Sequence, residues 1–194
     1  MLDRRIGRQD ESGLESARDS ARLVREELAR LAGLVSDFLR FARPSDLRVG
    51  PADACETIRQ IAELMRPEVV AAGARLEVRA PAAAISARFD EERIKQAIIN
   101  LVRNAREAAG HGGEVALGLA RADGMLVIEV EDTGPGIADG IDIFEPFRTT
   151  KEQGTGLGLP IVFRIVTDHR GRIGVNRRGG RTVFTIELPI EGPR

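Results

Sequence analysis

The sequence predicts an α/β two-layer sandwich preceded by one long helix, and three observations support this fold class. Near the start, apolar residues recur every three or four positions, as they do on one side of a helix. Further along, two pairs of segments with alternating apolar residues are each joined by a short turn containing glycine. Helical segments lie between these strand segments. Hairpins of this kind indicate a mixed, largely antiparallel sheet covered by helices, rather than a doubly wound parallel sheet.

The first element that we expect is a helix from Gly13 to Ala42. Ser12 and Glu15 can form a capping box at its start. Arg43-Pro44 ends it, because the residue before a proline is pushed out of the helical region. At about 1.5 Å per residue the helix is about 45 Å long. Its apolar seam consists of Ala21, Val24, Leu28, Leu31, Val35, Phe38 and Ala42, and Leu34, Leu39 and Phe41 widen this stripe.

A stripe of this width indicates that the helix contacts more than one neighbour, as in a helical bundle. A long helix lying on the core of its own domain is the alternative, which the regular spacing and the sharp stop disfavour. We therefore divide the chain into residues 1–44, with the helix at about 13–42, and residues 45–194.

After the linker PSDLRVGP, Asp53 and Glu56 can cap a helix that turns Ile58, Ile61, Leu64 and Met65 inward. RLEVRA and ISARF alternate like strands, and a second helix runs from about Asp90 to Ala109. The apolar face of this second helix is Ile94, Ile98, Leu101, Ala105 and Ala108. EVALGLA and MLVIEVE flank the turn Asp123-Gly124, and RIGVN and TVFTIEL flank Arg-Arg-Gly-Gly.

Composition excludes several classes of function. The 29 Lys and Arg residues are balanced by 30 Asp and Glu residues and are scattered among them, so we expect no nucleic-acid binding. Cys55 is the single cysteine, and with two histidines it cannot make a usual zinc site. No run of about 18 apolar residues exists, and MLDRRIGRQDESG lacks the apolar region of a signal peptide. We expect a cytoplasmic chain that makes no membrane contact itself.

Two polar clusters indicate a phosphate-bearing ligand. Asn100 and Asn104 stand one turn apart at the edge of the apolar face of their helix, where amide oxygens suit a Mg²⁺ ion held through phosphates. In DTGPGI, Asp132 ends a strand and can accept the exocyclic amine of adenine. Gly134 and Gly136 allow a flat ring to approach the backbone. The alternative for Asn100 and Asn104 is that they are solvated, and the alternative for DTGPGI is an ordinary turn.

In the segment GTGLGLPIV, residues 154–162, glycines at alternate positions are followed directly by an apolar helix. Backbone N–H groups and the positive end of that helix would face an anion in the loop. It matches neither the G-x-x-x-x-G-K-[ST] loop nor a dinucleotide-binding fingerprint.

NLVRNAREA, DTGPGI, FEPFRTTK and GTGLGL resemble, in order and spacing, the N, G1, F and G2 boxes of sensor histidine kinases, within the GHKL class of ATPases with the Bergerat fold. The resemblance covers residues 45–190 and is strongest to the nitrogen-regulator branch. RLAGLVSDFLRFARP is similar to the second helix of the kinases' dimerisation and phosphotransfer hairpin. The resemblance implies ATP and Mg²⁺ as ligands, a homodimer through that hairpin, and the receiver domain of a response regulator as partner.

The resemblance assigns roles to matching positions, and residues 138–153 would be a mobile lid. Mg²⁺ would be held by Asn104, helped by Asn100. The lid residues would be Phe144, Phe147 and Arg148. Arg148 and Lys151 would either pair with phosphate oxygens or remain solvated. The ATP site would comprise Asn100, Asn104, Asp132, Gly134, Gly136, Ile137, Lys151, Gly154, Thr155, Gly156, Leu157, Gly158 and Leu159.

Asn100 stands where the hydrolytic members of the class carry a glutamate, and an amide cannot activate water. We therefore expect phosphoryl transfer to a histidine. Residues 1–13 contain no acceptor histidine, so MLDRRI would be the tail of the first hairpin helix in a kinase cut after its acceptor. His111 and His169 are interpreted as surface or helix-capping residues. Two alternatives stay open, a non-catalytic nucleotide-binding dimerisation module and a serine kinase of the anti-sigma type.

Overall fold

The computed structural model describes residues 17–18, 20–25, 27–28, 31–33, 46–138, 140–149 and 155–193. The chain divides into two units, Met1–Arg43 and Pro44–Arg194. In the first unit the described residues are helical, in agreement with the predicted helix, and Leu23, Val24, Leu28 and Leu31 are exposed on it. The predicted capping box, the stop at Arg43-Pro44 and the remainder of the seam lie outside the described residues.

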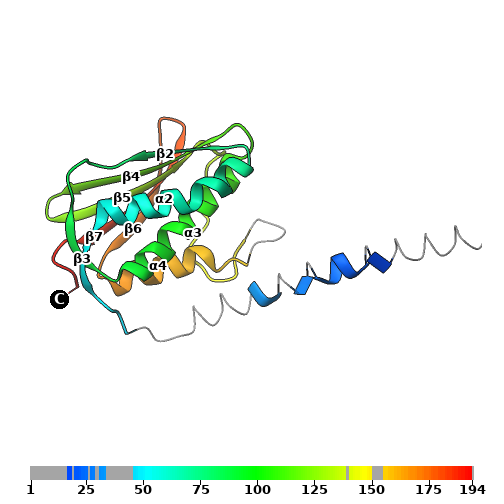
Figure 1. Ribbon diagram of the computed structural model, residues 1–194, viewed down its shortest axis with the longest axis horizontal. Coiled ribbons are helices and arrows are strands. Elements are labelled where there is room, and N and C mark those ends of the chain that lie inside the picture. The colour runs from blue at the N-terminus through cyan, green and yellow to red at the C-terminus, as the bar shows by residue number, and fades with distance from the viewer. Residues whose placement is uncertain are drawn as a thin grey trace, which may run out of the picture. The chain divides into compact units, whose positions relative to one another are not determined.

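The second unit has two layers, with three helices covering one face of a sheet (Figure 1). Its elements are β1 (Gly50–Asp53), α2 (Ala54–Ala71), β2 (Arg75–Arg79), β3 (Ser86–Phe89), α3 (Glu91–Ala109), β4 (Glu114–Ala122), β5 (Met125–Asp132), α4 (Gly158–Asp168), β6 (Arg172–Arg178) and β7 (Arg181–Pro189). The main sheet has the order β2-β4-β5-β7-β6, and only the β2–β4 pair is parallel. The predicted two-layer sandwich with a largely antiparallel sheet is therefore confirmed.

The core lies between the helices and the sheet. Along β5 every second residue is buried, from Leu126 through Ile128 and Val130 to Asp132. The apolar stripes of α2 and α3 close over this face, with Ile61 and Ile98 almost fully buried. The polar residue that ends the alternation of β5 thus points to the same side as the core, at the rim of the sheet.

Two residues predicted to be buried are exposed. Leu64 is 63% exposed, because at about 100° per residue it is turned well away from the stripe of Ile58, Ile61 and Met65. Ala108 is also exposed. It lies in the last turn of α3, which extends past the core to the loop that follows β5.

The segment interpreted as a linker, residues 44–51, ends in the first two residues of β1, which pairs antiparallel with β3. Its sequence GPAD has no apolar alternation, so nothing local indicated a strand. The pairing fixes the entry to α2, where Asp53 accepts a hydrogen bond from the backbone N–H of Cys55 at 2.9 Å. The predicted cap at Asp53 is confirmed.

His169 joins the end of α4 to the start of α3. Its Nε2 accepts the backbone N–H of Asp90 at 3.0 Å, and its Nδ1 donates to the carbonyl of Ile165 at 2.7 Å. The ring is 1% exposed. Both ring nitrogens are thus used inside the fold, and the prediction of a capping residue is confirmed, whereas His111 is exposed.

Candidate functional site

Asp132 is a buried carboxylate at the end of β5. It is 2% exposed, and its Oδ1 accepts the backbone N–H of Gly134 at 2.8 Å. Burial raises the pKa of Asp132 above its ordinary value of 3.8, against the lowering effects of the Gly134 N–H, the Thr182 hydroxyl and the positive charge of Arg177. A carboxylate held in this way remains an acceptor for which further donors, such as the amino group of a base, are favourable.

The loop after Asp132 is fixed on both sides. Thr133 bonds with Glu114 of β4 through its N–H and its hydroxyl, at 3.2 and 2.9 Å. A Cβ on Gly134 would lie 2.7 Å from the carbonyl oxygen of Ala108 on α3. The glycine at 134 is therefore required by the close approach of the protein's own helix, in addition to any approach by a ligand. Gly136 has φ +94°, a conformation that favours glycine, and Ile137 is 38% exposed.

Asn100 and Asn104 are half-buried on α3 and face the first residue of α4. Nδ2 of Asn100 donates to the carbonyl of Gly158 at 3.4 Å. Nδ2 of Asn104 is 3.9 Å from the place where a Cβ on Gly158 would stand. The two asparagines thus stand together, as their one-turn spacing predicted, and both lie beside the start of α4.

The segment before α4 presents backbone donors. Leu157 precedes the helix and has no side-chain oxygen with which to cap it. Its own N–H donates to the hydroxyl of Thr155 at 3.2 Å, and Gly156 has φ +66°. The first turn of α4, with Gly158 and Leu159, therefore carries the partial positive charge of a helix start, which suits an anion.

In its described part, the predicted lid contacts α4 through a ring and the segment before α4 through a backbone bond. The rings of Phe144 and Phe163 on α4 are 5.2 Å apart between centroids. The N–H of Phe147 donates to the carbonyl of Gly156 at 3.1 Å, but its ring is 62% exposed. The role of Phe147 as a lid residue stays a prediction. Arg148 pairs with Glu145 at 2.8 Å, and Lys151 and Gly154 lie outside the described residues.

Helix α3 connects the parts of the candidate site. Asn100 and Asn104 meet the start of α4, and Ala108, one turn later, meets the loop after Asp132. The fold thus places the buried carboxylate, the asparagines and the uncapped helix start around one helix.

Two further residues belong to this region, and the sequence analysis missed both. Thr182 on β7 is buried, pairs with Asp132 across the sheet and donates its hydroxyl to that carboxylate. A polar residue on the buried face of TVFTIEL was the available signal. Arg177 on β6 pairs with Thr182 and donates to the carbonyl of Gly134 at 3.3 Å. No local pattern distinguishes it from the neighbouring arginines.

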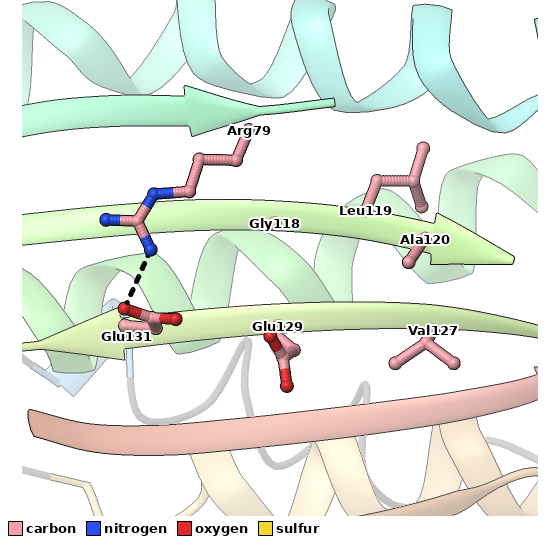
Figure 2. A pocket seen from close by; sticks show the side chains of 7 residues that line it. All are labelled: Arg79, Gly118, Leu119, Ala120, Val127, Glu129 and Glu131. Carbon is pink, nitrogen blue, oxygen red and sulfur yellow. Dashed lines mark hydrogen bonds and ion pairs between the residues drawn. The ribbon is translucent and has the colours of Figure 1, made fainter. Parts of the chain in front are cut away.

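The opposite face of the sheet is occupied by ion pairs. Figure 2 shows Arg79 of β2 reaching across β4 at Gly118 to Glu131 of β5, at 3.1 Å. The shallow depression there is lined by Arg79, Gly118, Leu119, Ala120, Val127, Glu129 and Glu131. Its charges are matched, since Glu129 also pairs with Arg178. We do not place the functional site on this face.

Two features that the described residues lack bear on other chemistries. In that part of the chain, no group of three or more His, Cys, Asp or Glu side chains is arranged to hold a metal ion. Among the same residues, no helix combines the length and the apolar character needed to cross a bilayer.

Comparison with known proteins matches residues 89–192 to a family described as histidine kinase-, DNA gyrase B-, and HSP90-like ATPases. Sensor histidine kinase ZraS of Klebsiella oxytoca is 33% identical over 180 residues, which cover 91% of this chain and 39% of that protein. The chain therefore spans well under half of the length of this relative.

Solved structures give the same result. The catalytic domain of histidine kinase ThkA is 33% identical with a TM-score of 0.70, and the match covers 74% of this chain and 97% of that domain. Full-length ShkA in complex with AMPPNP is 32% identical with a TM-score of 0.79, covering 91% of this chain and 39% of that one. ThkA has also been solved with the response regulator TrrA, at 29% identity, a TM-score of 0.75, and coverage of 87% and 49%. Because the family model spans more than half of this chain and the ThkA catalytic domain is matched almost throughout, the chain belongs to the histidine kinase-, DNA gyrase B- and HSP90-like ATPases, and within them to the catalytic domains of sensor histidine kinases.

Proposed function

We propose that this chain binds ATP and is the catalytic core of a two-component kinase that transfers the γ-phosphoryl group to a histidine. The observation that carries the proposal is the buried carboxylate of Asp132, whose loop meets the C-terminal turn of α3, the helix on which two asparagines face an uncapped helix start. Asp132 would accept the amino group of adenine. Residues 154–159 would surround the phosphates, and Lys151 and Arg148 of the lid would pair with them.

Mg²⁺ fits the donors available in the site. Asn104 and Asn100 would hold it through amide oxygens, and the phosphates and water would complete its coordination. The described residues contain no carboxylate cluster that could bind the ion without the nucleotide. When bound, the ion would neutralise charge on the phosphates. Asn100 does not remove a proton from water, so the γ-phosphoryl group would be kept for a better nucleophile.

The partner of the phosphorylated histidine would be the receiver domain of a response regulator. The solved complex of ThkA with a response regulator supports this class of partner. The helix of the first unit would contribute to a homodimer through a helical hairpin, because its described apolar residues are exposed.

Titration calorimetry with ATP tests the nucleotide site. Asp132→Asn keeps the shape but removes the charge, and we expect ATP to bind about 1.5 to 3 kcal/mol more weakly, the effect of losing a hydrogen bond to a charged group. Arg121→Gln, on the exposed end of β4, is the control and leaves the affinity unchanged. Equal affinity of wild type and Asp132→Asn would remove Asp132 from the site.

The role of Asn104 is tested by the same titration with and without Mg²⁺. Asn104→Ala is expected to abolish the gain in ATP affinity that Mg²⁺ gives, with the fold retained because the side chain is only half-buried. If the Mg²⁺ effect persists in Asn104→Ala and disappears in Asn100→Ala, the metal role belongs to Asn100.

Phosphoryl transfer separates the kinase from a non-catalytic nucleotide-binding module. The chain is incubated with γ-labelled ATP and a separate protein that carries the acceptor helix of a histidine kinase. A kinase labels that helix with acid-labile phosphate, and Asp132→Asn reduces the labelling. A chain that binds ATP yet labels no acceptor would be a binding module.

A further inference from the structure

Three side chains form a row across neighbouring strands at one end of the sheet. Asp132 of β5 is paired with Thr182 of β7, and Thr182 is paired with Arg177 of β6. Residues paired across antiparallel strands have their side chains on the same face. The row therefore lies on the face covered by the helices, with Arg177 at its outer end.

Arg177 reaches the loop that follows Asp132. Its Nη1 donates to the carbonyl of Gly134 at 3.3 Å, and Gly134 donates its own N–H to Asp132 at 2.8 Å. A Cβ added to Gly136 would collide with the same Nη1. The guanidinium thus lies over the backbone between residues 134 and 136, and Gly134 links it to Asp132, because its carbonyl accepts from Arg177 and its N–H donates to Asp132.

The contacts of Arg177 differ from those of its neighbours. Arg178 pairs with Glu129 and Arg181 with Glu114, both across the open face of the sheet. Within the described part of the chain, Arg177 makes no ion pair. Its positive charge is therefore not neutralised by a neighbouring carboxylate in that part of the fold, and its effect on Asp132 is the lowering of the pKa of that carboxyl.

We propose that Arg177 is a positioning residue for the base-binding end of the site, whose guanidinium fixes the loop 132–136 and thereby the acceptor carboxyl of Asp132. The expected effect of Arg177 on ATP binding rests on the proposed function, whereas its expected effect on Asp132 does not. Arg177 acts through Asp132 and Gly134 rather than by taking part in the reaction.

Other charged groups on the surrounding elements are engaged elsewhere. Glu114 on β4 pairs with Arg75 and Arg181, Glu131 on β5 pairs with Arg79, and on α3 Arg106 pairs with Glu68 and Glu107. Thr182 contributes a hydroxyl and no charge. Arg177 is consequently the charged group whose removal should change the titration of Asp132.

The test compares Arg177→Met, Arg177→Lys and the control Arg178→Met in the complete chain. The first readout is the titration of the Asp132 carboxyl by ¹³C NMR without nucleotide, with Asp132→Asn used to assign the signal. Arg177→Met should move the midpoint upward by roughly half a unit to one unit, since an opposite charge nearby has been removed. Arg177→Lys keeps the charge and should stay close to wild type, and Arg178→Met should not shift the midpoint.

The second readout is ATP affinity between pH 5 and 8. Arg177→Met should bind ATP roughly fivefold to tenfold more weakly at neutral pH, about the effect of one ordinary hydrogen bond lost from the loop that holds Asp132. The deficit should grow as the pH falls, because Asp132 then becomes protonated earlier in this variant. An unchanged Asp132 midpoint in Arg177→Met, or an equal loss of affinity in Arg178→Met, would overturn the inference. Absence of ATP binding by the wild type would refute the proposed function, and the nucleotide-free titration would still decide the role of Arg177.

Discussion

Asp132 is held in a place that is unfavourable for a charged residue. Burial raises its pKa, so the folded state binds a proton more tightly than the unfolded state. The protein therefore loses stability as the pH rises from the ordinary value of the carboxyl through the raised one. In the proposed site, the amino group of adenine would supply a further donor to this partly desolvated acceptor. This residue thus connects the stability of the domain with its proposed use.

Replacing Asp132 by Asn should make the domain more stable while it impairs ATP binding. The amide oxygen can still accept the N–H of Gly134, and the cost of burying a charge disappears. We expect the free energy of unfolding of Asp132→Asn in urea to equal or exceed that of wild type at pH 7. The difference should shrink as the pH falls through the raised pKa of Asp132 towards the ordinary value of 3.8, and stay constant below it. A variant less stable than wild type at pH 7, with the gap widening at higher pH, would contradict this account.

At the scale of the elements, the two faces of α2 should respond very differently to truncation. Ile61 is 1% exposed and Leu64 is 63% exposed. Ile61→Ala should lower the free energy of unfolding by about 2 to 5 kcal/mol, because it leaves a cavity in the core. Leu64→Ala, the matched control, should change it by less than about 0.5 kcal/mol. Equal losses in urea denaturation would mean that Leu64 is covered in solution.

Elements with local signals could be predicted from the sequence, and those without could not. The cap at Asp53, the start of α3 next to Asp90 and the alternation along β5 depend on neighbouring residues, and they are found where expected. Strand β1 depends on β3, which lies more than 30 residues away, and its own residues give no sign of it. Thr182 and Arg177 reach Asp132 only through the register of three strands, a property of the sheet rather than of either hairpin.

In the candidate site, too, the features set by neighbouring residues could be predicted and those set by distant contacts could not. Asn100 and Asn104 could be placed together because helical spacing fixes their relation, and the start of α4 follows from its glycines. The exposed ring of Phe147 could not be foreseen, because it depends on a positive φ of 65° and on a backbone bond to Gly156. Side-chain direction in such a loop is decided by contacts distant in sequence.

For the whole molecule, incubation of the chain with γ-labelled ATP alone should yield no acid-labile phosphate. Its two histidines are poor acceptors. His169 is 1% exposed with both ring nitrogens hydrogen-bonded, and His111 lies in the turn after α3, on a segment fixed to the same domain by the bond from Gly112 to Gly73. In-line attack needs an imidazole that can reach the γ-phosphate. Label found on either histidine without an added acceptor would contradict the proposal that the phosphate is transferred to a histidine on a separate acceptor helix.

The apolar residues of the first unit predict that the chain self-associates. Leu23, Val24, Leu28 and Leu31 are 46–62% exposed, and a helix with such a stripe tends to bury it against another surface. We expect sedimentation to give a mass that rises with concentration, and Leu31→Glu to restore a monomer because it places a charge in the stripe. Arg25→Glu, a charge change on the same helix outside the stripe, is the control and should leave the association intact. ATP affinity should be the same in all three chains, because the site is built within the second unit. A wild type that sediments as a monomer at all concentrations would show that this stripe is covered within the chain, and the nucleotide site would be unaffected by that result.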